Sequence, residues 1–253
     1  MTNSPPSAAV LLIGDEILSG RTKDKNLGYI ADYLAALGID LKEARVVSDM
    51  EDDIVQAVNA LRMRYTYVFT TGGIGPTHDD ITADAMARAF GVGIDHDPKA
   101  VEILLGFFKE IGREPNEARL RMARIPKGAS LIENAVSKAP GFQIGNVFVM
   151  AGVPRIMQAM MDELAPRLTK GVVMQSRCIE FSGGEGDVAK PLGEIQAHFP
   201  AVIIGSYPFQ AADGFATNLV LRSRDPGALE EAFAAVKAMA QDLTTQGKAR
   251  GWS

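Results

Sequence analysis

The sequence contains little of the chemistry on which several common protein classes depend. Cys178 is the only cysteine among 253 residues, which excludes an internal disulfide and any metal site built from several cysteines, and which fits a reducing cytoplasm. Basic residues are not in excess, since 26 Lys and Arg stand against 31 Asp and Glu, a formal net charge of −5. We therefore expect no general attraction to nucleic acid or to an anionic membrane surface.

Targeting and membrane segments are also absent from the sequence pattern. The first seven residues contain no basic region, and the apolar run at residues 8–13 is too short for a signal peptide. No stretch reaches the roughly 20 apolar residues of a membrane span. With 47% hydrophobic residues the chain can nevertheless bury a full core. These features predict a globular, cytoplasmic protein that does not enter a membrane.

Strand-like and helix-like segments alternate along the first two thirds of the chain. The expected strands are residues 8–13, 39–47, 67–71 and 147–151. The expected helices are residues 27–37, 51–62, 81–90, 98–111, 116–123 and 155–168. This alternation predicts an α/β fold, a three-layer α/β/α sandwich around a mainly parallel sheet, over a first domain at residues 1–170.

The pattern changes near residue 170. A strand at residues 172–181, a glycine-rich turn at residues 183–186, a helix, two short strands and a last helix at residues 229–243 follow. They predict a second, small α+β domain over residues 171–253. The turn has an acid inside it and another after it, unlike the basic loops of RNA-binding modules, so we interpret it as structural, for example as a contact in a dimer.

The most informative segment is the glycine-rich loop after the strand at residues 67–71. Gly72, Gly73 and Gly75 carry no Cβ, so they can adopt positive φ and point successive backbone N–H groups at an anion. The loop leads to the N-terminus of a helix, which favours a phosphate. It is not a Walker loop, which requires a lysine, nor a dinucleotide fingerprint, because His78 stands where the last glycine belongs.

Acids follow this loop directly. Asp79 and Asp80 would repel a bare phosphate unless a divalent cation or a hydroxyl-bearing ligand intervened. The loop therefore suggests a site for phosphate together with a metal ion.

Four motifs in order carry a family resemblance. They are Gly14-Asp15-Glu16-Ile17-Leu18-Ser19-Gly20, the segment Thr71 to Thr82, Pro140-Gly141-Phe142 and Gly152-Val153-Pro154. Over about residues 8–170 the chain resembles the molybdopterin-binding domain of molybdenum-cofactor biosynthesis proteins. The order and spacing are most similar to the competence/damage-inducible protein A (CinA) family and to the similar domain of eukaryotic FAD synthases.

The resemblance implies an architecture as well. The C-terminal part resembles the small KH-like module that follows this domain in CinA proteins. The nicotinamide-nucleotide amidase domain of the larger CinA proteins has no counterpart in this sequence, so we expect a short form without that activity.

The resemblance also implies site residues. Asp49 and Asp80 match two functional aspartates that handle the pterin and the addition of AMP to its phosphate, and they are the expected ligands of Mg²⁺ or another divalent cation. Binding of molybdopterin or a related phosphorylated ligand is expected of Gly14, Asp15, Glu16, Thr71, Gly72, Gly73, Gly75, Pro76, Thr77, Asp79, Gly141, Gly152 and Pro154. Relatives form dimers or trimers, and we expect a homo-oligomer here too.

Several candidate residues have structural alternatives. Asp24 and Asn26 fit N-capping of the following helix as well as a place in the site. Ser48 and Glu51 form a capping-box pattern around Asp49, and Thr77 with Asp80 approximates a second one. The basic run Arg113, Arg119, Arg121, Arg124 and Lys127 fits either a counter-charge for phosphate or a solvated helix face.

Two departures from the family pattern affect the expected activity. Asp15 stands where most relatives have threonine, and Ile156 replaces a carboxylate of the CinA pattern, which favours binding without turnover. Three hypotheses stay open. The leading one is a molybdopterin-binding protein; the others are a metal-dependent ADP-ribose pyrophosphatase and a non-catalytic assembly module.

Overall fold

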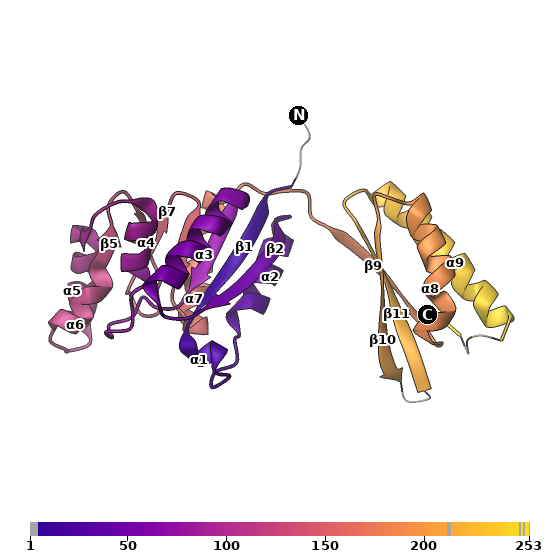
Figure 1. Ribbon diagram of the computed structural model, residues 1–253, viewed down its shortest axis with the longest axis horizontal. Coiled ribbons are helices and arrows are strands. Elements are labelled where there is room, and N and C mark those ends of the chain that lie inside the picture. The colour runs from indigo at the N-terminus through magenta and orange to yellow at the C-terminus, as the bar shows by residue number, and fades with distance from the viewer. Residues whose placement is uncertain (1–4, 212–213, 248, 250, 253) are drawn as a thin grey trace. The chain divides into compact units, whose positions relative to one another are not determined.

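The computed structural model describes residues 5–211, 214–247, 249 and 251–252. The chain divides into two compact units, Met1–Gly171 and Val172–Ser253 (Figure 1). The first unit has two hydrophobic cores and the second unit has one of its own. Within the described part, no helix has both the length and the apolar character that a membrane crossing requires.

The first unit contains a six-stranded sheet with the order β2-β1-β3-β8-β7-β6. Its strands are β1 (Ser7–Ile13), β2 (Asp40–Val47), β3 (Tyr67–Thr71), β6 (Ser130–Ile132), β7 (Gly141–Ile144) and β8 (Val147–Met150). The pairs β1–β2, β1–β3 and β3–β8 are parallel, whereas β7 runs antiparallel to both of its neighbours. The predicted mainly parallel sheet is thus confirmed.

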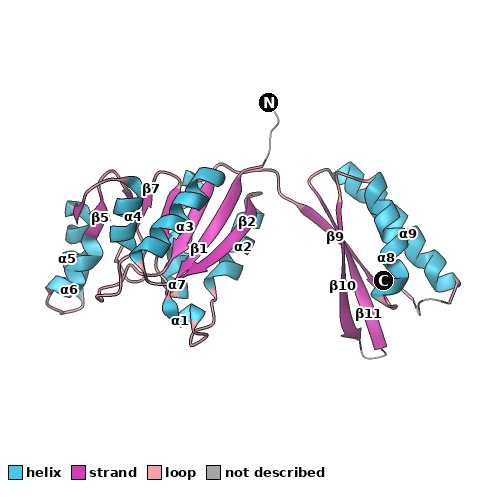
Figure 2. Ribbon diagram, in the orientation of Figure 1, coloured by secondary structure: helices cyan, strands magenta, loops and turns pink. Residues whose placement is uncertain are grey.

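Alternate side chains of β1 enter two different cores, because successive residues of a strand point to opposite faces. Ala9 and Leu11 pack with buried residues of three helices, and Val10 and Leu12 with buried residues of two others. The first group is α3 (Glu51–Arg64), α4 (Thr82–Phe90) and α5 (Pro98–Glu110); the second is α2 (Asn26–Ala36) and α7 (Pro154–Asp162). Helices on both faces confirm the predicted three-layer sandwich (Figure 2).

Short elements complete this unit and were not predicted one by one. They are α1 (Asp15–Leu18), β4 (Ile94–His96), α6 (Glu117–Leu120), the 3₁₀ turns η1 (Arg121–Ala123) and η2 (Ala165–Arg167), and β5 (Arg124–Pro126). The helix expected at residues 116–123 is in fact α6 followed by η1. Such elements of three or four residues are too short to show a period in the sequence.

The second unit has the order β9 (Gln175–Phe181), α8 (Glu185–His198), β10 (Ile203–Ala211), β11 (Gly214–Ser223) and α9 (Pro226–Thr245). Its three antiparallel strands lie in the order β10-β11-β9, and buried residues of both helices pack on one face of this sheet. The two strands expected to be short form a long hairpin. The expected turn at residues 183–186 is also shorter than predicted, because α8 already begins at Glu185.

Candidate functional site

The carboxyl ends of three neighbouring strands meet at Gly72. Its φ of 108° is one that side-chain-bearing residues rarely adopt, and a Cβ there would lie 2.1 Å from the carbonyl oxygen of Ile13, which ends β1. The turn after β8 approaches from the other side, since a Cβ on Gly152 would lie 3.3 Å from the Cα of Gly72. Ligands of open α/β sheets bind at this edge. Only glycine lets the three turns come this close.

The backbone N–H of Gly72 is already used. It donates to the carbonyl oxygen of Met150 at 3.1 Å and so extends the pairing of β3 with β8. The prediction that Gly72 offers its N–H group to a ligand is therefore wrong. By contrast, the N–H groups of Gly73, Ile74 and Gly75 make no hydrogen bond within the described part of the chain. The candidate anion-binding amides are those of residues 73–75.

Thr82 closes the loop that carries these amides. This wholly buried first residue of α4 donates its hydroxyl to the carbonyl oxygen of Gly72 at 3.0 Å, and its N–H to that of Gly73 at 3.0 Å. A Cβ on Gly73 would lie 2.2 Å from the same hydroxyl. The two loop carbonyls are thus held against the helix. The sequence motif ended at Thr82, but its structural role was not predicted.

Asp80 folds back on Thr77. One of its carboxylate oxygens accepts both the N–H and the hydroxyl of Thr77, at 2.8 and 2.5 Å. The N-cap residue of α4 is Ile81, which makes no side-chain cap. The capping-box alternative for Thr77 and Asp80 is therefore wrong, and so is the expectation that the Thr77 hydroxyl is free to donate to phosphate.

A cleft of about 650 Å³ lies between this loop, α5 and the turn between β8 and α7. Its polar lining includes Glu16, Thr22, Asp80 and Ser137, and its apolar wall includes Phe107, Phe108, Met122, Val153 and Ile156. Eight predicted site residues come together around it: Glu16, Gly72, Gly73, Gly75, Pro76, Asp80, Gly152 and Pro154. The isoleucine at position 156, noted as a departure from the family pattern, is part of the apolar wall.

The other predicted site residues do not line this cleft. Thr71 is buried within β3, and the side chains of Thr77 and Asp79 are exposed. Gly141 belongs to β7, where a Cβ would lie 2.3 Å from the carbonyl oxygen of Val149. Packing therefore explains this glycine. Gly14 donates its N–H to the carbonyl oxygen of Val47.

Asp49 lies beside a second group of acids. Its carboxylate accepts the N–H of Asp15 at 2.9 Å and so holds the start of α1. Burial raises the pKa of Asp49, and the negative charges of Asp15, Glu16 and Asp79 raise it further, partly offset by the hydrogen bond from Asp15. Raised carboxyl pKa values of this kind are frequent at functional sites.

The capping-box alternative at Asp49 is not supported. Ser48 donates its hydroxyl to Asp53, and the N-cap residue of α3, Met50, makes no side-chain cap. As for a metal centre, no group of three or more His, Cys, Asp or Glu side chains among the described residues has the geometry to hold a metal ion. The metal-binding roles of Asp49 and Asp80 stay predictions.

The two candidate caps of α2 have separate roles. Asp24 accepts the N–H groups of Asn26 and Leu27, at 3.2 and 2.9 Å, and so ties down the first turn of α2, although the N-cap residue itself is Lys25. Asn26 is buried and donates its side-chain N–H to the carbonyl oxygen of Gly152 at 2.8 Å. It therefore supports the turn on the far wall of the cleft.

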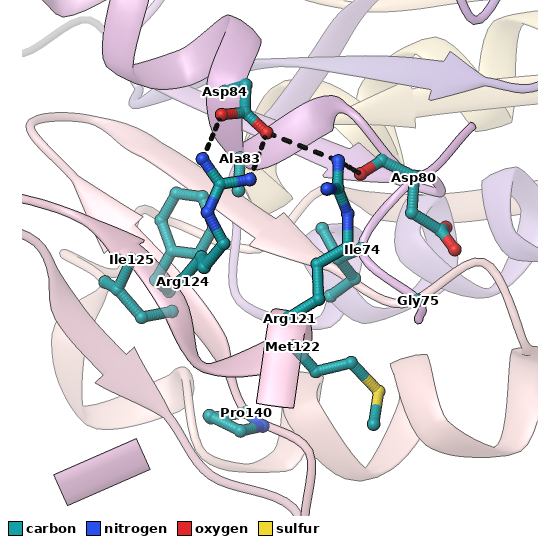
Figure 3. A pocket seen from close by; sticks show the side chains of 12 residues that line it. Ile74, Gly75, Asp80, Ala83, Asp84, Arg121, Met122, Arg124, Ile125 and Pro140 are labelled. Atoms are coloured by element: carbon teal, nitrogen blue, oxygen red, sulfur yellow. Dashed lines mark hydrogen bonds and ion pairs between the residues drawn. The ribbon is translucent and has the colours of Figure 1, made fainter. Parts of the chain in front are cut away.

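An arginine cluster lies behind the glycine loop (Figure 3). Arg124 donates two hydrogen bonds to the Asp84 carboxylate, at 2.9 and 2.6 Å. The Nη2 of Arg121 lies 3.6 Å from the same carboxylate and 3.3 Å from the carbonyl oxygen of Asp80. Of the predicted basic run, Arg121 thus reaches the loop at Asp80, Arg124 binds Asp84 of α4, and Arg119 lies over the ring of Phe108.

Comparison with known proteins agrees with this geometry. A family model described as "Probable molybdopterin binding domain" matches residues 9–170, which span all the residues described above. The chain belongs to this family. A second model, "FAD synthase, middle domain", matches residues 173–247. The first match confirms the resemblance inferred from the four motifs; the KH-like character of the second unit stays a prediction.

Individual relatives support the CinA-like assignment. The crystal structure of the protein CinA with unknown function from Thermoplasma acidophilum has a TM-score of 0.60 and 32% identity, over 64% of this chain and 98% of its own. A CinA-like protein of Citrifermentans bemidjiense is 40% identical over 64% of this chain and 40% of its own length.

Longer alignments connect the chain to archaeal and eukaryotic relatives. A protein of Thermococcus kodakarensis is 34% identical over 88% of this chain and 93% of its own length. A "Probable FAD synthase" of Caenorhabditis elegans is 33% identical over 88% of this chain, which spans 48% of that longer protein.

Proposed function

We propose that the cleft binds a phosphorylated pterin or a related nucleotide. The N–H groups of residues 73–75 would hold the phosphate, and the ring system would pack against Phe107, Met122 and Ile156. One observation carries the proposal: three backbone donors without an internal partner lie beside an apolar wall in one cleft of about 650 Å³. That volume lies within the range of ordinary ligand pockets, roughly 300–1,000 Å³.

The surrounding residues support phosphate binding at the amides and binding of the rest of the ligand in the cleft. Helix α4 begins two residues after Asp80, so its N-terminus adds a favourable dipole near the phosphate. Thr82 keeps the loop carbonyls turned toward the helix, which prevents their oxygens from opposing the anion. Asp80 and Glu16 supply carboxylate acceptors in the lining of the cleft and would take N–H or hydroxyl donors of the ligand.

Calorimetric titration with molybdopterin, ADP-ribose and FAD tests the proposal. We expect at least one of them to bind, and its affinity to fall about tenfold in Gly75→Ala, because a Cβ there would lie 2.6 Å from the Asp80 carboxylate and would displace this ligand acceptor from the cleft wall. The matched control is Gly106→Ala in α5, where an added Cβ meets nothing within 4 Å. Equal binding by the Gly75 and Gly106 variants would contradict the proposal.

Metal-dependent hydrolysis of ADP-ribose is the second candidate. It is favoured by the raised pKa of Asp49, which lies near two acids of the first strand end, and by the similarity to a "Probable FAD synthase". The described side chains do not form a ready metal site, so we derive no step through a metal ion. Release of AMP with Mg²⁺, Mn²⁺ or Co²⁺ that disappears in Asp80→Asn would favour the hydrolase.

The third candidate is a non-catalytic assembly module. Failure of every pterin and nucleotide to raise the melting temperature would favour it. The proposed homo-oligomer, a dimer or trimer, is tested independently by light scattering of the full chain.

A further inference from the structure

Arg121 has a donor that the protein leaves unused. Its Nε is buried and has no hydrogen-bond partner in the described part of the chain. Buried N–H groups without an acceptor are rare in folded proteins, so such a group calls for an explanation, commonly a bound water or ion. The side chain as a whole is 31% exposed.

The charge of Arg121 is also incompletely compensated. Asp84 is the acid nearest to it, but Arg124 already occupies that carboxylate with two hydrogen bonds. Two guanidinium groups therefore share one carboxylate, and the longer contact, 3.6 Å, belongs to Arg121. Figure 3 shows the Arg121 side chain passing beside Ile74, with its guanidinium between Asp84 and Asp80.

A small recess adjoins this side chain. It has a volume of about 20 Å³ and is lined by Arg121 together with Gly73, Ile74, Gly75, Asp80 and Met122, among others. Those last five residues also line the large cleft, so the two spaces share the glycine loop as a wall. A volume of this size holds one water molecule, or one oxygen atom of a larger group.

We propose that Arg121 is the side-chain anion ligand of the glycine loop. In this arrangement one phosphate oxygen enters the recess and accepts the Nε–H of Arg121, while the N–H groups of residues 73–75 hold the other oxygens. The inference rests on the proposed function and adds to it a positively charged specificity residue, which favours a doubly charged phosphate over a neutral ligand. Arg124, held by Asp84, supports this arrangement and does not touch the anion.

Inorganic phosphate, titrated at constant ionic strength with chloride as the balancing anion, is the probe. We expect Arg121→Gln to raise the phosphate Kd about tenfold, since a charge-assisted hydrogen bond is lost. Arg119→Gln removes the same charge from the neighbouring turn without touching the loop, and we expect its Kd to stay within about twofold of the wild type. Arg121→Lys should fall between the two, because it keeps the charge and loses the fork of donors.

Asp84→Asn distinguishes an anion-binding Arg121 from one that only stabilises the fold, because the two roles predict different changes in phosphate affinity. If Asp84 competes with the anion for Arg121, its neutralisation should tighten phosphate binding even though an ion pair is lost. Weaker binding in this variant would contradict the inference.

Chemical modification tests the same idea in the unaltered protein. Phenylglyoxal should modify Arg121 more slowly in the presence of phosphate, as measured by peptide mass spectrometry, while the rate at Arg119 stays the same. This readout does not depend on the folding of a variant.

The outcomes separate the inference from the proposed function. Full phosphate binding by Arg121→Gln, with binding lost in Gly75→Ala, would overturn the inference and leave the proposed function standing; the recess would then hold only a water. Absence of any phosphate binding or protection in the wild type would overturn both.

Discussion

The chain contains two glycine-rich turns, each of which joins a strand to a helix, yet they differ in why glycine is present. In Gly72-Gly73-Ile74-Gly75, an added Cβ at either of the first two glycines would lie 2.1 or 2.2 Å from a neighbouring oxygen. In Gly183-Gly184-Glu185-Gly186, an added Cβ on Gly184 would be 3.4 Å from Asp187, and one on Gly186 would meet nothing within 4 Å. Close packing requires glycine at positions 72 and 73 but not at positions 184 and 186.

Free N–H groups do not distinguish the two turns. The N–H groups of residues 73–75 in the first turn and of residues 184–186 in the second make no hydrogen bond within the described residues. In the second turn, Gly183 donates to Phe181, Asp187 donates to the carbonyl oxygen of Gly184, and the buried Thr217 donates its hydroxyl to the carbonyl oxygen of Gly183. An abundance of glycine is therefore a weak sign of a site, whereas packing-enforced glycine beside free amides is a strong one. The contrast in packing supports the structural interpretation of the second turn.

The largest effect is expected at the first turn. Gly72→Ala places a Cβ against the backbone of β1 at a φ that disfavours alanine, and the two costs, about 1–2 kcal/mol for the conformation and about 1–3 kcal/mol for the overlap, both act on the folded state. Urea denaturation followed by far-UV circular dichroism measures the loss.

A matched variant shows whether the loss is specific to that turn. Gly184→Ala makes the same change at a residue with φ of −75°, where the added Cβ would make only an ordinary contact of 3.4 Å with the Asp187 side chain. We expect its unfolding midpoint to change little. If both variants lost the same stability, the steric distinction between the turns would be wrong.

The next effect is expected from the anchor of the loop. Thr82→Val keeps the shape of the side chain but removes the buried hydrogen bond to the carbonyl oxygen of Gly72, at a cost of about 1–3 kcal/mol. Because the loop then loses one of its two ties to α4, we also expect weaker phosphate binding by calorimetry.

Thr244→Val is the control for this change. Its hydroxyl donates to the carbonyl oxygen of Ala240 within α9, far along the chain from the loop, at 2.8 Å. A helical back-bond of this kind contributes little, so its stability should stay near that of the wild type. A phosphate affinity unchanged in Thr82→Val would mean that the loop does not depend on its anchor.

Local patterns in the sequence predicted the fold well wherever the pattern was long. The strand at residues 67–71 and the parallel sheet follow from apolar runs that are buried on both faces. Strand β7 was missed because Pro140-Gly141 reads as a turn, although Gly141 is needed there to admit the carbonyl oxygen of Val149. Short elements with no buried residue, such as α1, leave no apolar period to detect.

The site was predicted less completely, for a physical reason. The sequence indicated which residues gather at the strand ends, and eight of them line one cleft. It could not indicate that the N–H of Gly72 donates to the carbonyl oxygen of Met150, since that hydrogen bond joins residues far apart in the chain. The roles of Asn26 and Arg121 depend on contacts of the same long-range kind, and that of Thr82 depends on how the loop closes on itself.

A gain in stability is expected at the second turn. Gly186→Ala introduces a better helix former at a position of α8 where the added methyl group meets no atom, and it reduces the freedom of the unfolded chain. We expect a gain of about 0.5–1 kcal/mol, measured by urea denaturation. Trp252, the only tryptophan, lies in the second unit and reports on it by fluorescence. A loss of stability would show that this glycine, like Gly72, is required.

The smallest effect concerns the acids beside the first turn and depends on pH. Since burial and neighbouring negative charges raise the pKa of Asp49 above its ordinary value of 3.8, its ionised form disfavours the folded state. Asp49→Asn keeps an oxygen that can accept the N–H of Asp15, and it should therefore raise the melting temperature at pH 7. The gain should vanish as the pH falls below 3.8, where the wild-type carboxyl is protonated in both states. Solvent screening limits it to about 1 kcal/mol at most.

Glu43→Gln, in the same unit, should change the melting temperature at pH 7 in the opposite direction. Hydrogen bonds from Tyr65 and Arg45 lower the pKa of Glu43, so its ionised form favours the folded state. The substitution should lower the melting temperature at pH 7, and the difference should disappear as the wild-type carboxylate is protonated at low pH. Melting curves of both variants from pH 3 to pH 7 would make the comparison. If Asp49→Asn lowered the melting temperature at pH 7, as Glu43→Gln is expected to do, the Asp49 carboxylate would stabilise the fold by holding α1. The destabilising charge that points to a functional acid would then be absent.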